Sequence, residues 1–267
     1  MNRLLDKLFL IAKYQTVIAL RYRNGAPFRL VASAVEIASA YFLARAVGPQ
    51  FRPDGFGYFA FLLTGTGLYF FFLAVVNSCV SFVDDAQRSG TIEVLMTTPT
   101  PPLQVLMLNV LPLLAWRGLG MILYLSAGMV LFATDPLRIN AVAAIVVFSL
   151  LLLVAAAFGM IGAAVQMIFF RGNSLVWALG VLGGLFMGTA FPVSVLPAPL
   201  QWIATALPLR TSLDALRAAI LQNATFAELS ATILQLFIFG SVFLLLGVVS
   251  FEWALRRARK TGTLAFY

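Results

Sequence analysis

The sequence predicts an all-α membrane protein, and three observations support that prediction. Apolar residues make up 61% of the chain, and its mean hydropathy is +0.97, whereas soluble domains are about 45–50% apolar. Only 10% of the residues are charged, against about 25% in globular proteins. Several apolar runs reach the roughly 20 residues that a helix needs to cross a bilayer, and none alternates over about ten residues like a membrane β-strand.

Six apolar stretches are expected to cross the membrane. They cover residues 30–47, 58–83, 103–133, 139–170, 175–190 and 229–255. The third and fourth are longer than an upright crossing requires, so we expect them to tilt or to extend beyond the bilayer. Residues 30–255 are therefore expected to form one six-helix transmembrane domain, without a separate soluble domain.

The distribution of Lys and Arg predicts the orientation. With the amino terminus inside, the cytoplasmic segments contain twelve basic residues and the outer segments contain four. The cytoplasmic set is Arg3, Lys7, Lys13, Arg21, Arg23, Arg29, Arg88, Arg171, Arg256, Arg257, Arg259 and Lys260, and the outer set is Arg52, Arg138, Arg210 and Arg217. Because cytoplasmic loops accumulate Lys and Arg, we expect both termini to lie in the cytoplasm. We expect the protein itself to lie in the inner membrane of the cell. This topology explains the net charge of +8 without nucleic acid as a partner.

The two ends of the chain are basic. In residues 1–29, apolar side chains recur every three or four residues among Lys and Arg. A basic helix with one apolar face suits the headgroup plane of an anionic leaflet, so we expect an amphipathic interfacial helix, with a solvated tail as the alternative. Residues 256–267 are expected to form a basic cytoplasmic tail.

Prolines interrupt the outer segment that precedes the last span. Pro197, Pro199 and Pro208 break helices, and the apolar stretch 200–207 is too short to cross, which favours a re-entrant or interfacial piece. Asp214 and Arg217 follow, with opposite charges three residues apart on one helical face.

The residue inventory excludes most enzymatic chemistry. The chain has no histidine, the commonest metal ligand and general base, and Cys79 is its only cysteine. No catalytic or metal-binding residue is expected. The phosphate-binding pattern G-x-x-x-x-G-K-[ST] is absent, and residues 259–262 have the wrong order for it. If ATP drives this protein, ATP and Mg²⁺ bind to another polypeptide, so no cofactor is expected on this chain.

A polar segment, residues 84–99, separates the second span from the third on the expected cytoplasmic side. Its charges would orient a short helix on a polar partner; a solvated connector is the alternative. The segment reads acidic-x-x-Arg-x-Gly-Thr-x-Glu-x-Leu-x-x-Thr-Pro, with Asp85, Arg88, Gly90, Thr91, Glu93, Leu95, Thr98 and Pro99 in the defined positions. This pattern resembles the cytoplasmic coupling helix of ABC transporter permeases of the type-2 exporter (ABC-2) family.

Two further stretches resemble the same family. The outer run with Pro192, Pro197, Pro208, Asp214 and Arg217 is similar to its re-entrant outer gate, and residues 256–264 are similar to its usual ending. The resemblance implies that Asp84 and the residues of the pattern above contact an ATPase subunit. One departure is that residues 84–87 read Asp-Asp-Ala-Gln, where the family often has Glu-Arg-Glu, so one acidic group is missing from the docking surface.

The resemblance implies a function. The chain would be the transmembrane permease subunit of an ATP-driven exporter, with no enzymatic activity of its own. It would pair with an identical or paralogous protomer and with two copies of a cytoplasmic nucleotide-binding ATPase. An Arg-Asp-rich segment, usual in the polysaccharide exporters of the family, is missing ahead of the first span. This absence favours a drug, a lipid or another hydrophobic compound as cargo, with a polysaccharide as the alternative.

Two functions outside this family also stay open. An ion-coupled secondary transporter needs titratable groups near the midplane, often in repeated halves, but Glu36 is the only acidic residue well inside a span and no repeat is visible. An integral membrane enzyme or assembly subunit is the other alternative. Such an enzyme usually needs histidine, a cysteine pair or paired carboxylates within one span, and this chain has none of them.

Several residues within the spans are candidates for the path or the dimer seam. A charge inside a bilayer usually faces a partner, water or the bundle interior. Glu36 and Arg117 are therefore expected to pair with each other or across two protomers, or Glu36 to recognise a cationic substrate. Tyr69 and Phe72 are candidates for an aromatic wall of the path. The spacing G-x-x-x-G at Gly180, Gly184 and Gly188 predicts a close helix contact, and we expect the dimer seam there.

Overall fold

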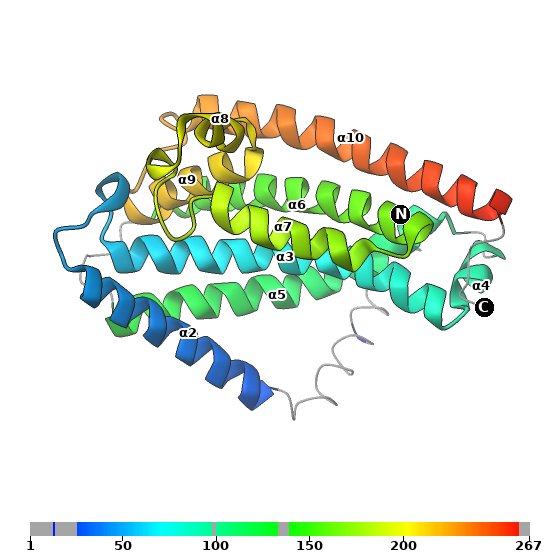
Figure 1. The fold of residues 1–267 in the computed structure, drawn as a ribbon, viewed down its shortest axis with the longest axis horizontal. Helices are drawn as coiled ribbons and strands as arrows, with labels where there is room; N and C mark the ends of the chain where they lie inside the picture. The colour runs from blue at the N-terminus through cyan, green and yellow to red at the C-terminus, as the bar shows by residue number, and fades with distance from the viewer. Residues whose placement is uncertain (1–12, 14–25, 98–99, 133–138, 262–267) are drawn as a thin grey trace.

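The computed structural model describes residue 13 and residues 26–97, 100–132 and 139–261, and every element within them is helical (Figure 1). The long helices are α2 (Ala26–Val47), α3 (Tyr58–Arg88), α5 (Pro102–Phe132), α6 (Ala141–Phe169) and α10 (Ser230–Thr261). The short ones are α4 (Thr91–Thr97), α7 (Gly172–Phe186), α8 (Ala198–Ala206) and α9 (Pro208–Leu221), with single 3₁₀ turns at η2 (Pro53–Gly55) and η3 (Val193–Val195).

Among the described residues, five helices are long and apolar enough to cross a membrane: α2, α3, α5, α6 and α10. The chain is therefore a multi-pass membrane protein, as predicted. The fifth predicted span, residues 175–190, is shorter than expected, because α7 has 15 residues where about 20 are needed. It ends at Phe186 rather than at residue 190. The chain turns there because Gly188 adopts a φ of +69°, in the left-handed region that favours glycine.

Helix α3 lies at the centre of the bundle, with 61% of its membrane-spanning window buried, against 11% of that of α2. Helices α6 and α10 run in the same direction as α3, whereas α2, α5 and α7 run in the opposite direction (Figure 1). Small residues allow close contacts between these helices. A Cβ at Gly159 of α6 would lie 2.7 Å from the sulfur of Cys79 on α3, and one at Gly247 of α10 would lie 2.8 Å from the carbonyl oxygen of Ala157 on α6.

Helix α2 packs on the bundle through its carboxyl-terminal half. Ile37 is buried, and the Tyr41 ring contacts those of Phe59 on α3 and Phe132 on α5. Nearer its start, Phe28 is 78% exposed, and the helix diverges from α3 and α5 (Figure 1). Packing therefore holds α2 at one end only.

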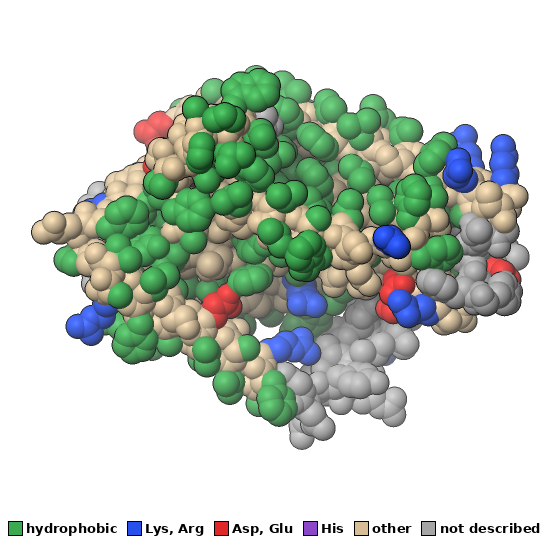
Figure 2. All heavy atoms as spheres, in the orientation of Figure 1, with side chains coloured by type: hydrophobic (Ala, Val, Ile, Leu, Met, Phe, Trp, Pro, Cys, Tyr) green, Lys and Arg blue, Asp and Glu red, His purple; other side chains and the backbone are tan. Residues whose placement is uncertain are grey.

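The surface separates apolar from basic regions. Figure 2 shows hydrophobic side chains over most of one face, and Lys and Arg at the end where α4 and the carboxyl end of α10 lie. This separation matches a membrane-embedded body with one basic end.

Two predicted boundaries move. Helix α2 begins at Ala26, so it includes residues 26–29, which the sequence assigned to the interfacial helix. Apart from those residues and the exposed, helical Lys13, that expected helix lies outside the described part of the chain. Helix α10 continues to Thr261, so residues 256–261 are helical rather than a tail. Basic side chains suit a helix carboxyl end, and Arg256 donates a hydrogen bond to Glu252 one turn earlier.

Candidate functional site

A buried polar network, here called the inner network, joins three helices at the basic end of the bundle. It consists of Asp84 and Gln87 on α3, Gln166 on α6 and the backbone N–H of Gly172, the first residue of α7. The Gln166 amide donates to Oδ1 of Asp84 at 2.8 Å and to Oε1 of Gln87 at 3.2 Å, and its own oxygen accepts from Gly172 N at 2.7 Å. Gln87 and Gln166 are fully buried.

The inner network follows from how α6 ends. Phe170 adopts a left-handed conformation with a φ of +54°, and α7 begins two residues later. The first N–H groups of a helix lack partners within the helix, and the Gln166 side chain supplies an acceptor for one of them. A Cβ at Gly172 would lie 2.6 Å from both Gln166 and Val80, so no larger residue fits at the start of α7. Gln87 and Gln166 were not among the residues predicted from the sequence. The signal that could have identified them is a polar amide side chain within an otherwise apolar helix.

The prediction that Asp84 lies on the docking surface is wrong. Its side chain is buried, bonded to Gln166 on one oxygen and, on the other, to Nε of Arg88 at 2.9 Å. Helical phase explains the difference. Asp84 and Gln87, three residues apart, point at α6, whereas the neighbouring Asp85 is exposed.

Helix α4 is a separate short helix at this end of the bundle. The chain turns between α3 and α4 at Gly90, which has a φ of +68° and no neighbouring atom within 4 Å of a Cβ placed there. Glycine is therefore required for its backbone conformation rather than for close packing. Ile92 is 3% exposed and forms one wall of an apolar pocket between α4 and the bundle. That pocket is lined by Phe82, Val83, Ala86, Pro102, Val105, Met167 and Phe251.

The outward side of α4 and of the last turn of α3 is exposed. We call it the α4 surface, and its members are Asp85, Arg88, Thr91, Glu93 and Val94. Four of these belong to the predicted coupling pattern. The Leu95 side chain and residues 98 and 99 lie outside the described part of the chain.

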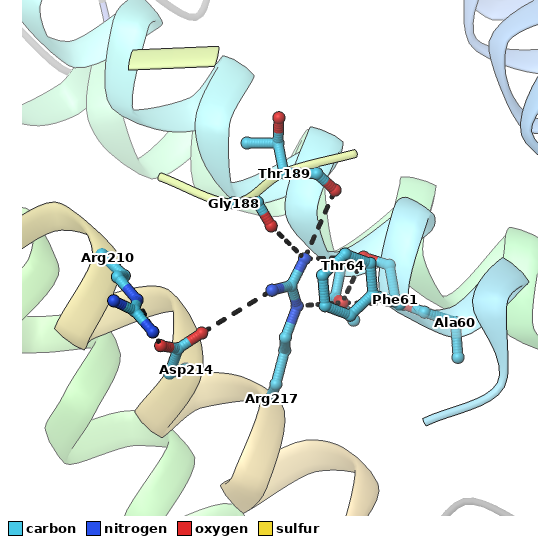
Figure 3. A network of polar contacts seen from close by, with 8 residues as sticks. All are labelled: Ala60, Phe61, Thr64, Gly188, Thr189, Arg210, Asp214 and Arg217. Atoms are coloured by element: carbon cyan, nitrogen blue, oxygen red, sulfur yellow. Dashed lines mark hydrogen bonds and ion pairs between the residues drawn. The ribbon is translucent and has the colours of Figure 1, made fainter. Parts of the chain in front are cut away.

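At the opposite end of the bundle, Arg217 of α9 is the centre of a second buried network, here called the outer network (Figure 3). Its Nη2 donates to the carbonyl oxygens of Phe61 at 2.9 Å and Gly188 at 3.0 Å, and more weakly to that of Thr189 at 3.4 Å. Its Nε donates to Oγ1 of Thr64 at 3.3 Å, and its guanidinium lies 3.5 Å from the centre of the Phe61 ring. Arg217 is 1% exposed, so α9, α3 and the turn after α7 meet around one buried cation.

The charge of Arg217 is balanced on α9 itself. Its Nη1 lies 3.7 Å from Oδ1 of Asp214, and the other oxygen of Asp214 lies 3.3 Å from Nε of Arg210. The predicted contact between Asp214 and Arg217 is thus present. Burial lowers the pKa of Arg217 to about 10, which leaves the side chain charged at neutral pH. The Arg217 side chain approaches the backbone of α3 closely, since a Cβ at Gly65 would lie 2.6 Å from Nη2 of Arg217.

The outer prolines lie where helical elements begin. Pro192 precedes η3, Pro197 precedes α8 and Pro208 is the first residue of α9. Proline suits such positions because it lacks the N–H that would have no partner within the helix. In α8, Ala204 is buried while Trp202 is 77% exposed. The re-entrant placement of this region in a membrane stays a prediction.

Glu36 and Arg117 do not pair within this chain, so that alternative is wrong. Glu36 lies within electrostatic reach of the Tyr124 hydroxyl, and Arg117 within electrostatic reach of Arg29. The reason is register: Arg117 lies two turns before Tyr124 on α5, as Arg29 does before Glu36 on α2. Pairing across protomers and contact with a substrate stay predictions.

The aromatic and glycine candidates meet inside the bundle. The Tyr69 hydroxyl donates to the carbonyl oxygen of Gly180, and a Cβ at Gly184 would lie 3.7 Å from that hydroxyl. These two glycines therefore accommodate an α3 side chain of the same protomer, and Gly188 lies beyond the end of α7. Phe72 is fully buried, so it belongs to the core rather than to an open wall. The dimer seam stays a prediction.

Metal binding has no candidate within residues 26–97, 100–132 and 139–261, because no group of three or more Cys, Asp or Glu residues is placed to hold an ion.

Most of the chain matches a known family. The model of a family described as "ABC-2 family transporter protein" matches residues 46–249, which include α3, the α4 surface, both networks and most of α10. No curated protein matches this chain.

Proposed function

Because this chain belongs to the ABC-2 family of transporter proteins, it is a permease subunit of an ABC transporter, and we propose that it forms the path of an ATP-driven exporter. The observation that carries the proposal is the α4 surface, an exposed polar surface anchored in a predominantly apolar bundle. ATP hydrolysis takes place on a separate subunit in this proposal, and the chain contributes no catalytic residue.

Permeases of this family generally work with a nucleotide-binding ATPase, and we assign the joint to the α4 surface. Asp85, Arg88 and Glu93 present charges of both signs there, which suits orientation on a polar partner. Two ATPase copies, each with bound ATP and Mg²⁺, would dock on two permease protomers, and the path would lie between the protomers. The second protomer is a copy of this chain or a paralogue.

The pocket under α4 explains how a docked ATPase would act on the bundle. Ile92 lines that pocket together with residues of four long helices: α3, α5, α6 and α10. A displacement of α4 would therefore alter a pocket that all four helices share. The inner network lies beside the pocket, since Gln87 donates to the carbonyl oxygen of Met167, a pocket residue. It extends the connection to the first residue of α7.

We propose that the chain crosses the inner membrane of the cell six times and that both termini lie in the cytoplasm. Helices α3, α6 and α10 run in one direction and α2, α5 and α7 in the other (Figure 1), as an even number of crossings requires. Helix α7 and the turn after it extend along α3. Gly172, at the start of α7, lies beside Val80 of α3, and Thr189, in the turn after α7, lies beside Gly65 of α3. These positions on α3 are about 22 Å apart, so α7 would cross where the bilayer or the bundle is locally thin. The basic end with α4 supports the cytoplasmic assignment.

The proposed cargo is a drug, a lipid or another hydrophobic compound, moved outward. The support is the apolar character of the bundle and the lack of the Arg-Asp-rich segment that is usual in polysaccharide exporters of the family. A polysaccharide is the alternative.

The test is co-purification from the native host in mild detergent, followed by mass spectrometry. We expect a stoichiometric P-loop ATPase with the wild-type chain, and its loss from the double variant Thr91→Arg with Glu93→Arg. Both positions are exposed on the α4 surface, so the substitutions alter the charge of the docking face without disturbing the core.

A matched control is the double variant Gln222→Arg with Glu228→Arg. It adds the same charge at exposed positions at the opposite end of the bundle, and should retain the ATPase. Loss from both double variants would contradict docking at α4. Recovery of the wild-type chain without an ATPase, under conditions that preserve membrane complexes, would favour an ion-coupled transporter.

A further inference from the structure

Helices α2 and α5 carry a further set of charged groups that belongs to neither network. Arg29 and Glu36 lie seven residues apart on α2, and Arg117 and Tyr124 lie seven apart on α5, so each pair shares one helical face. The two helices run in the same direction, and Arg29 lies within electrostatic reach of Arg117, as Glu36 does of Tyr124. The Tyr124 hydroxyl also lies 3.2 Å from Oγ1 of Thr66 on α3.

The space between these groups, here called the α2–α5 cleft, opens where α2 diverges from the bundle. Figure 2 shows basic and acidic side chains along a gap beside α2, within a surface that is otherwise largely hydrophobic. Exposed apolar side chains adjoin the two arginines in the chain: Phe28, 78% exposed, precedes Arg29, and Trp116, 44% exposed, precedes Arg117. The cleft is therefore polar inside and apolar at its rim.

The charges of the cleft have no partner within the described part of the chain. Arg29, Glu36 and Arg117 make no hydrogen bond or ion pair there. Arg217, in contrast, has four oxygen acceptors and an aromatic ring. Unpaired charges are costly in helices that cross a bilayer, so we expect their partner to come from outside the described residues.

Charge and shape identify that partner. Two adjacent arginines repel each other, and with Glu36 the cleft has a net charge of about +1, so an anion relieves the repulsion. Guanidinium groups bind phosphate and carboxylate through paired hydrogen bonds. Because the rim is apolar and faces the lipid, the anion arrives as part of an amphiphile rather than as a free ion.

We propose that the α2–α5 cleft binds the anionic headgroup of a lipid-like amphiphile between Arg29 and Arg117, with the apolar chain along the exposed sides of α2 and α5. The negative charge of Glu36 lowers the affinity of the cleft for anionic headgroups more than its affinity for zwitterionic ones. That this amphiphile is the cargo rests on the proposed function; the binding itself does not.

The test uses Trp116, which is 44% exposed and adjacent to Arg117. In the full chain, Trp177, Trp202 and Trp253, all exposed, are replaced by Phe, so that Trp116 alone reports. The protein is placed in phosphatidylcholine vesicles that contain brominated phosphatidylglycerol or, at equal mole fraction, brominated phosphatidylcholine. Bromine quenches tryptophan fluorescence at short range, so the two titrations give the relative affinity for the anionic lipid.

We expect about a fivefold preference for phosphatidylglycerol, since each basic group near an anionic lipid contributes about a factor of five. Arg29→Gln with Arg117→Gln should abolish or reverse the preference, and Glu36→Gln should raise it to about 25-fold. The control is Arg45→Gln on the same helix, an arginine that lies over the Tyr41 ring, which should leave the preference unchanged.

Three results would overturn the proposal: no preference in the parent protein, equal loss in Arg45→Gln, or relief of quenching by inorganic phosphate at constant ionic strength. The last would indicate a soluble anion as the ligand. None of these measurements uses an ATPase, so a negative result leaves the proposed coupling at α4 intact, and a missing ATPase leaves the lipid preference intact.

Discussion

The inner and outer networks fix the two ends of α7 to α3, and they do so with different chemistry. At the inner end, the amide of Gln166 caps Gly172 and bonds to Asp84 and Gln87. At the outer end, the buried cation of Arg217 bonds to the carbonyl oxygens of the turn after α7. Hydrogen bonds from a charged donor contribute about 1.5–3 kcal/mol each, and neutral ones about 1. We therefore expect the outer end to be the firmer attachment, and the inner end, beside the α4 surface, to be the one that yields.

The largest effect is expected at Arg217. Arg217→Met should lower the free energy of unfolding by about 3–5 kcal/mol, because several buried acceptors lose their donor and Asp214 its partner. Unfolding of the purified protein in detergent measures this change. Arg210→Met is the control: its partly exposed side chain has a single ion pair, to Asp214, and the variant should lose less than about 1 kcal/mol. Equal losses would remove the contrast between the two ends.

An intermediate effect is expected at the inner end. Gln166→Leu keeps the size of the side chain but leaves the N–H of Gly172 without its acceptor and Oδ1 of Asp84 without its donor, at a cost of about 1–3 kcal/mol. Amide hydrogen exchange should increase at residues 172–176 and stay unchanged at residues 186–189. Ser149→Ala, an exposed position on the same helix, should change neither. Faster exchange at both ends of α7 would contradict independent attachments.

The smallest effect concerns the close approach in the outer network. Gly65→Ala places a Cβ 2.4 Å from the carbonyl oxygen of Thr189, and overpacking of this kind costs about 1–3 kcal/mol. The gain in helix propensity returns about 1 kcal/mol, so a net loss of about 1 kcal/mol remains. Gly120→Ala on α5 meets no atom within 4 Å and should be stabilising, by about 1 kcal/mol. A stabilising Gly65→Ala would mean that the outer turn shifts easily.

Sequence and structure agree most closely on the long helices. The predicted spans begin and end within a few residues of α3, α5 and α6, because hydropathy is a property of each segment alone. They diverge at α7, where a turn at Gly188 shortens the helix, and at α10, where the helix extends through the basic residues. Neither difference changes the apolar content from which the spans were predicted.

The candidate site was predictable in part. The pattern around Arg88 and Glu93 identified the α4 surface, since an exposed polar segment stands out in an apolar chain. The pattern did not indicate that Asp84 faces inward, because this depends on where Gln166 lies on another helix. The partner of Asp214 was predictable from its spacing to Arg217, whereas the acceptors of Arg217 on α3 and after α7 were not.

The sequence alone determined that this protein is a helical membrane protein, where its main helices lie, and which polar segment interrupts them. The tertiary structure decided which polar groups are buried, how they hold the two ends of α7, and which charges of α2 and α5 have no partner among the described residues. The physical reason is that transfer of a segment into a bilayer depends on its own composition. The satisfaction of a polar group depends on atoms brought to it by other helices.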